Sequence, residues 1–168
     1  WVNNWSTSHV YKMNTGEMLD TYTVVPETQT VGLGTSAVAE ATAQSFQRKT
    51  WYDGTRHWLA FNSGNEIQFY YSPDSGSNWF KNFSASISVA TNDFSIEADS
   101  TNAFIVYTDK DGIKARKASS YPGTSFSWGA ATVVYSGITT DPGYLAISKD
   151  SSDKIWVTAR RPALATIV

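Results

Sequence analysis

The sequence predicts an all-β protein of short antiparallel strands and tight turns, on the basis of three observations. Aromatic residues make up 14% of the 168-residue chain, beside many Ser, Thr, Asn and Gly residues, and this mixture favours strands and turns over helices. Helical periodicity is weak and confined to residues 35–46, which we expect to form a connector. The third observation is an internal repeat whose units read as short strands joined by turns.

The repeat consists of three related stretches. They read WYDGTRHWLAFN from Trp51, IEADSTNAFIVYT from Ile96 and AISKDSSDKIWVTA from Ala146. Each runs from a strand into an Asp-containing turn and then into an aromatic or β-branched strand, with Asp53, Asp99 and Asp150 aligned. These aspartates are 46 and 51 residues apart, close to the period of about 40–50 residues of a β-propeller blade. The sequence therefore predicts consecutive four-stranded antiparallel blades of a β-propeller.

Each unit is expected to hold four strands in chain order. In the first unit, residues 46–89, they are predicted at 46–52, 57–62, 66–72 and 83–89. In the second unit, residues 94–135, they are predicted at 94–98, 103–108, 112–118 and 131–135. Residues 144–168 are expected to begin a further blade, residues 1–25 to supply the last two strands of a preceding blade, and residues 26–45 to connect them to the first unit.

This count of blades does not close a ring. Propellers usually have four to eight blades, and a shorter array leaves sheet faces and edges open. We therefore expect either a longer natural chain or several associated copies, with about six blades in the ring. The start at Trp1 and the apolar end ATIV suggest a processed product or a fragment of a longer protein.

The octet SPDSGSNW, residues 72–79, is the most conspicuous motif. With Ser72, Asp74, Gly76 and Trp79 at the spacing S-x-D-x-G-x-x-W, it resembles the Asp-box of the sialidase-like (BNR repeat) β-propellers, and the sequence around it resembles their blades. Such an octet suits a turn between two strands, because the carboxylate accepts backbone amides and the glycine takes a positive φ. The resemblance implies a structural role on the face opposite the active site; the alternative is a ligand or metal role for Asp74.

Sialidase-type catalysis, as the resemblance implies, needs an arginine cluster, a tyrosine nucleophile paired with a glutamate, and an aspartate acid/base. The chain has five arginines, but none lies in the Arg-Ile-Pro motif of the family. No catalytic residue is therefore transferred by motif.

The candidates that remain are residues in the connections that, as the resemblance implies, form the functional face, together with Arg48, which could point toward a central channel from the first strand of its unit. The weak catalytic candidates are Arg48, Asp93, Asp141 and Arg160. The weak binding candidates are Arg160, Arg161, Asp109 and Asp111. For each of these residues, a solvated loop charge or a turn cap is the favoured interpretation.

Composition argues against several partner classes. The net charge of −2 is spread along the chain and leaves no basic stripe for nucleic acid. The chain has no cysteine and two histidines, so no metal or other cofactor is predicted. The sequence contains no run of about 18 apolar residues, the length that a membrane span needs. Two sequons, at Asn4 and Asn82, suit a protein that is exported to the cell surface or secreted.

Three functional hypotheses follow. The leading one is a non-catalytic sialidase-like propeller segment of an exported or surface protein that recognises a glycan or another protein, or takes part in a surface assembly. The first alternative is a sialidase-type glycoside hydrolase with further catalytic residues outside this segment. The second is a structural subunit of an oligomeric or filamentous extracellular assembly. Exposed aromatic residues suit sugar stacking, but for five tryptophans packing between blades is favoured; these are Trp51, Trp58, Trp79, Trp128 and Trp156.

Overall fold

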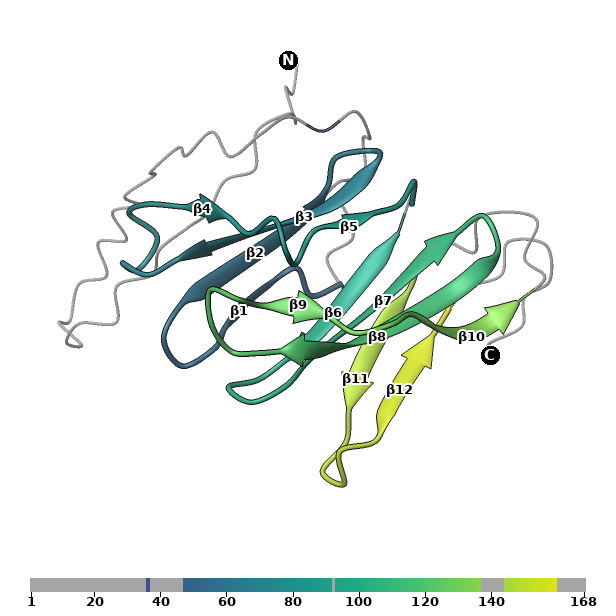
Figure 1. The fold of residues 1–168 in the computed structure, drawn as a ribbon. Helices are drawn as coiled ribbons and strands as arrows, with labels where there is room; N and C mark the ends of the chain where they lie inside the picture. The colour runs from purple at the N-terminus through teal and green to yellow at the C-terminus, as the bar shows by residue number, and fades with distance from the viewer. Residues whose placement is uncertain (1–35, 37–46, 92, 137–143, 160–168) are drawn as a thin grey trace, which may run out of the picture.

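The structure is a computed structural model that describes residue 36 and residues 47–91, 93–136 and 144–159 (Figure 1). Its regular elements in these residues are twelve β-strands, and every pairing between them is antiparallel. This confirms the all-β, antiparallel prediction for the described part of the chain. Over the same residues, no helix of the length and apolarity needed to cross a membrane is present.

The first sheet is formed by residues of the first predicted unit. Its strands are β1 (Thr50–Tyr52), β2 (His57–Asn62), β3 (Glu66–Ser72) and β4 (Phe80–Lys81) in that order, and β5 (Ile87–Ser88) also pairs with β3. The predictions for the second and third strands are confirmed, whereas a continuous strand at 83–89 is wrong. The chain leaves the ladder between β4 and β5 because the Asn82 side chain accepts hydrogen bonds from the Ser84 hydroxyl and the Ala85 amide.

The second sheet repeats this plan. Its strands are β6 (Phe94–Ala98), β7 (Ala103–Asp109), β8 (Gly112–Ser120) and β10 (Thr132–Ser136), and the short β9 (Ser127–Trp128) also pairs with β8. All four strands predicted for this unit match β6, β7, β8 and β10 to within two residues, but β9 was not predicted. The outermost position is again divided between two short strands, as in the first sheet.

The third sheet contains β11 (Ala146–Lys149) and β12 (Ile155–Thr158). These two strands are where the further unit was expected to begin. The remainder of that unit beyond residue 159, the strands expected at 1–25 and, except for residue 36, the connector expected at 26–45 lie outside the described residues.

The three sheets stack face to face, as Figure 1 shows from the first sheet in blue to the third in yellow. One hydrophobic cluster, which includes Trp58, Phe69 and Ile105, fills the space between the first and second sheets. Another, which includes Val106 and Ile147, lies between the second and third sheets. Because side chains of a strand alternate between its two faces, the second sheet buries apolar residues on both sides.

The first strands of successive sheets lie next to one another. The Ile96 amide of β6 donates to the Arg48 carbonyl, just before β1, at 3.1 Å. On the other side β11 packs against β6. The first strand of each sheet therefore approaches the first strand of the next.

An aromatic row crosses the first sheet. Trp51, Trp58, Tyr71 and Phe80 are successive cross-strand partners on β1 to β4, with ring centroids 5.7, 5.4 and 5.6 Å apart. The row begins with two buried tryptophans and ends at Phe80, which is 49% exposed. From the second sheet, Phe126 packs edge-on against Trp58 at 5.2 Å.

The predicted tryptophan packing is confirmed for Trp51 and Trp58, which are buried. Trp79 and Trp128 are half-buried. The prediction is wrong for Trp156, whose side chain is 61% exposed. Trp156 stands on the face of the third sheet that is turned away from the second sheet, where the described residues provide no further sheet to cover it.

The aligned aspartates all cap the turn between the first two strands of their sheets. Asp53 accepts the backbone amides of residues 55 and 56 at 2.8 and 2.7 Å. Asp99 does the same for residues 101 and 102, and Asp150 for residues 152 and 154. Each of these aspartates therefore lies in its predicted turn, and the sequence repeat is a structural repeat.

Candidate functional site

Arg48, one of the catalytic candidates, stands just before β1 and forms an ion pair. Its Nη1 lies 3.2 Å from Glu97 Oε1 on β6, with 43% of the Arg48 side chain and 23% of the Glu97 side chain exposed. The pair therefore joins the segment just before β1 to β6 of the second sheet. Because the guanidinium already has a carboxylate partner, binding a substrate carboxylate would require it to share or break this ion pair.

Asp93, a second catalytic candidate, is buried, and its hydrogen bonds connect segments that precede the first strands of all three sheets. Its carboxylate accepts a hydrogen bond from the Gln47 side-chain amide, which precedes β1. It also accepts the Leu145 amide, just before β11, at 2.6 Å. The Gln47 amide donates to the Leu145 carbonyl as well, at 3.0 Å. A carboxylate with these partners connects the strand ends and is shielded from solvent.

Lys49 lies in the same region and was not among the predicted residues. It is buried, with its Nζ 4.8 Å from the centroid of the Phe94 ring. Burial lowers the pKa of Lys49 to about 8, although the negative charge of Asp93 acts in the opposite direction. The signal was present in the sequence, because Lys49 is two residues before Trp51, and residues i and i+2 of a strand face the same side.

We expect this buried amine to make stability rise with pH between about 8 and 9.5. With a folded-state pKa of about 8 and an unfolded value near 10.4, the unfolded chain binds more protons in this range, so deprotonation favours folding. The free energy of unfolding should increase by about 1.5 kcal/mol over this interval. Urea melts at several pH values measure it, with Lys49→Met as the control that lacks the rise. A Lys49→Met variant with the same rise would contradict the assignment.

Asp109 and Asp111, the binding candidates, lie at the turn between β7 and β8. Asp109 accepts the amides of Asp111 and Gly112 at 2.8 and 3.1 Å, and it pairs with Lys114. Burial acts to raise the pKa of Asp109, but the hydrogen bonds from Lys114 and from these amides hold it below its usual range. Asp111 is more exposed and pairs with Lys110 at 2.7 Å. Asp109 is thus a turn cap.

The octet at residues 72–79 closes the connection from β3 to β4. The Asp74 carboxylate accepts the Ser72 hydroxyl and the Asn78 amide, both at 2.8 Å. Hydrogen bonds from the Asn78 side chain and backbone lower the pKa of Asp74. Gly76 has a φ of 94°, and its carbonyl accepts the Trp79 indole N–H at 3.1 Å. The side chains of Ser72, Asp74, Asn78 and Trp79 therefore all form hydrogen bonds within the turn, as the structural interpretation expects.

Replacing Asp74 with alanine should therefore lower the melting temperature, and the substitution leaves every catalytic candidate residue in place. We expect a decrease of about 2–4 °C, the range for loss of one turn-stabilising group in a chain of this size. The matched control is Asp111→Ala, which removes an exposed turn carboxylate whose partners are lysine side chains. Differential scanning calorimetry makes the comparison; equal melting temperatures for the two variants would contradict a structural role for the octet.

The sequon at Asn82 is not available in the folded chain. Asn82 is 3% exposed, and its side-chain nitrogen donates to the Thr124 carbonyl at 3.1 Å. A glycan on that nitrogen would need both exposure and the loss of this bond in the folded chain. The remaining predicted positions lie outside the described residues; these are Asn4, Asp141, Arg160 and Arg161.

The described residues do not gather the groups that the catalytic hypothesis needs. Arg48 binds Glu97, whereas Arg116 binds the Tyr107 hydroxyl at 3.0 Å and the Gly129 carbonyl. The described arginines therefore share no hydrogen-bond partner. Within the same residues, no group of three His, Cys, Asp or Glu side chains is placed to hold a metal ion.

Exposed aromatic side chains are the other notable feature of the surface. Phe83 is 77% exposed and lies beneath Lys81, whose Nζ is 5.1 Å from the ring centroid. Tyr52 and Tyr144 are 52% and 44% exposed.

Comparisons with protein-family models, with curated proteins and with solved structures found no match. Function is therefore argued from these groups themselves.

Proposed function

We propose that the chain forms consecutive blades of a sialidase-like β-propeller and acts as a non-catalytic recognition segment of an exported or surface protein. The propeller is supported by the similar strand order of the first two sheets, by their face-to-face stacking and by the approach of β1, β6 and β11 to one another. A ring of such units would place these innermost strands around a common axis.

One observation supports a non-catalytic role: the described charged residues that were candidates for catalysis or binding form structural contacts. Arg48 is paired with Glu97, Asp93 joins the ends of three sheets, and Asp109 caps a turn. Sialidase-type hydrolysis needs a free arginine cluster and an accessible acid. These contacts use such groups to position the sheets instead.

Recognition is supported by the exposed aromatic rings. An aromatic face with a polar neighbour can pack on the apolar face of a sugar ring, and Phe83 with Lys81 offers this combination. We therefore propose a glycan as the partner and Phe83 as a contact residue. Protein recognition uses the same kind of side chain, and it is the other outcome that the binding experiment below distinguishes.

Two measurements on the complete natural protein test this function. The first is turnover of a fluorogenic sialoside, for which we expect no activity. Turnover that disappears in Arg48→Ala but persists in Arg56→Ala would overturn the proposal in favour of the hydrolase. The second is binding to an array of immobilised glycans, for which we expect a signal that Phe83→Ala reduces and the exposed valine variant Val133→Ala does not. An array without signal would overturn glycan recognition.

A further inference from the structure

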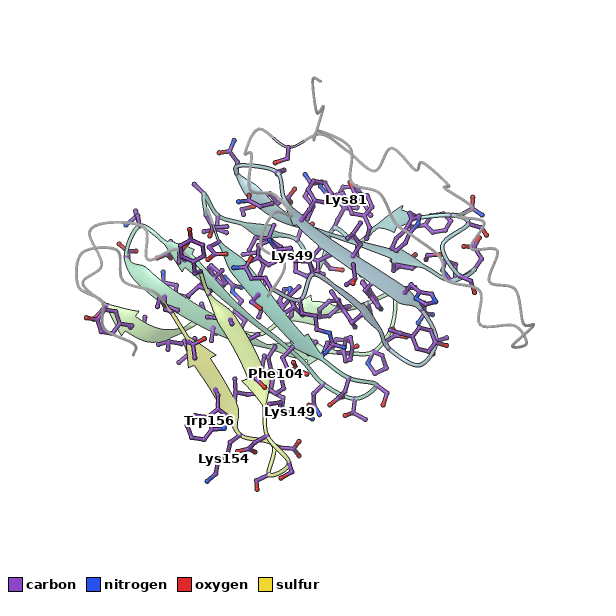
Figure 2. All side chains as sticks on the ribbon, turned by 180° about the vertical axis from the view of Figure 1, so that it is seen from behind. Lys49, Lys81, Phe104, Lys149, Lys154 and Trp156 are labelled. Atoms are coloured by element: carbon purple, nitrogen blue, oxygen red, sulfur yellow. The ribbon has the colours of Figure 1, made fainter. Side chains whose placement is uncertain are left out.

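The outer face of the third sheet carries a side chain whose counterparts in the other sheets are used for packing. Figure 2 shows Trp156 on the side of β12 away from Phe104 and Lys149, which lie between the second and third sheets. Trp156 is 61% exposed. Its cross-strand partner is Ser148, so a single large ring stands above small neighbours.

Trp156 occupies the position of Trp58 in the first sheet. Each indole N–H donates to the aspartate of its own turn, Trp58 to Asp53 at 2.8 Å and Trp156 to Asp150 at 3.0 Å. The two rings are therefore held in the same way by their own sheets. The two rings differ in solvent exposure, because the second sheet packs over Trp58 and leaves it 1% exposed. The ring of Trp156 is oriented for the same kind of contact.

The internal contacts show what such a ring packs against. Trp58 belongs to the cluster that contains Ala98 and Ala103, the two residues that flank the capped turn of the second sheet. Between the second and third sheets, Phe104 and Ile155 both pack against the hydrophobic cluster that includes Val106 and Ile147. Ile155 follows the capped turn of the third sheet. In both cases, the aromatic residue of one sheet and turn-flanking residues of the following sheet belong to or pack on the same hydrophobic cluster.

The first sheet presents the corresponding surface on its outer side. Tyr52 and His57 are cross-strand partners that flank the capped turn between β1 and β2, and their ring centroids are 4.8 Å apart. Alternation puts them on the face opposite Trp51 and Trp58. Tyr52 is 52% exposed and His57 is exposed. These residues stand in the chain where Ala98 and Ala103 stand in the second sheet.

We propose that Trp156 of one copy of the chain packs on Tyr52 and His57 of a second copy, in the same way as successive sheets pack within the chain. The proposal rests on the propeller arrangement proposed above. The described residues form three sheets, and the described sheets of two copies would together make about six, within the usual propeller range of four to eight. A head-to-tail contact of this kind closes into a ring when the rotation between units allows it.

Sedimentation velocity over a range of concentrations tests the contact with the full 168-residue chain. We expect a concentration-dependent dimer, and we expect Trp156→Ser and Tyr52→Ser each to raise its dissociation constant at least about tenfold, because exposed Trp and Tyr anchors dominate such interfaces. Phe83→Ser is the matched control, since Phe83 is 77% exposed and lies outside both surfaces; it should dimerise like the parent chain.

A mixing experiment makes the test specific for a head-to-tail contact. Equal amounts of the Trp156→Ser and Tyr52→Ser variants retain one intact pair of surfaces, so the mixture should form heterodimers that neither variant forms alone. A parent chain that stays monomeric at every concentration would overturn the proposal. So would a Tyr52→Ser variant that dimerises normally, because Trp156 would then have another partner. A monomer leaves the propeller itself standing, which the sialoside, glycan and structural measurements address separately.

Discussion

Replacing Trp58 with alanine should destabilise the chain by about 3–5 kcal/mol, the range for truncating a fully buried aromatic residue. Trp58 is 1% exposed and packs between Trp51 and Tyr71 within its sheet and against Phe126 of the second sheet. The substitution leaves a cavity between two sheets and removes the indole donor from the buried Asp53. Both effects act on the same inter-sheet contact.

The matched control for this prediction is Trp156→Ala. It removes the same type of side chain, with the same hydrogen bond to a turn aspartate, from an exposed position. We expect a loss below about 1 kcal/mol when the protein is kept dilute enough to be monomeric. Urea denaturation followed by tryptophan fluorescence and by far-UV circular dichroism measures both variants. Similar losses for the two would show that the sheets do not pack through Trp58.

The second large effect is expected for Gly112→Ala, at the start of β8. Gly112 has a φ of 144°, and a Cβ added there would lie 2.1 Å from the Tyr135 carbonyl oxygen of β10. The backbone of one strand must move to relieve this contact. Together with the cost of the positive φ, we expect a loss of about 2–4 kcal/mol.

Gly123→Ala separates the two causes. Gly123 has a similar φ of 139°, but a Cβ there would meet no atom within 4 Å. This variant should lose only the cost of the positive φ, about 1 kcal/mol. The difference in urea midpoint between the two variants measures the contact between β8 and β10. If Gly123→Ala were as unstable as Gly112→Ala, the close approach of these strands would be refuted.

The sequence predicted the strands with a strong hydrophobic pattern better than the short strands β4, β5 and β9, for a physical reason. Strands β2, β3, β6 and β7 alternate between two packed faces or carry long apolar runs, so their pattern is strong. The outer strands are short because local hydrogen bonds compete with the ladder. Asn82 shows this most clearly: its side chain holds a turn that divides β4 from β5, and residue type alone does not reveal that choice.

The candidate site was predicted less completely, because charge in a sequence carries no information on burial. Asp93 was selected from its connection, but its contacts with Gln47 and Leu145 join residues that are 46 and 52 positions away. Lys49 was missed because lysine is rarely buried, although its spacing from Trp51 placed it on the core-facing side. The turn aspartates were interpreted correctly, since their hydrogen bonds are local and follow from the turn sequence.

A high-resolution experimental structure of the complete natural protein tests the central claim most directly, that these sheets are blades of a propeller. The account predicts that β1, β6 and β11 line one common axis, that successive sheets are related by a constant rotation about it, and that residues 72–79 lie on the face opposite the ends joined by Asp93. Sheets that stack without a common axis, as in a sandwich, would contradict it.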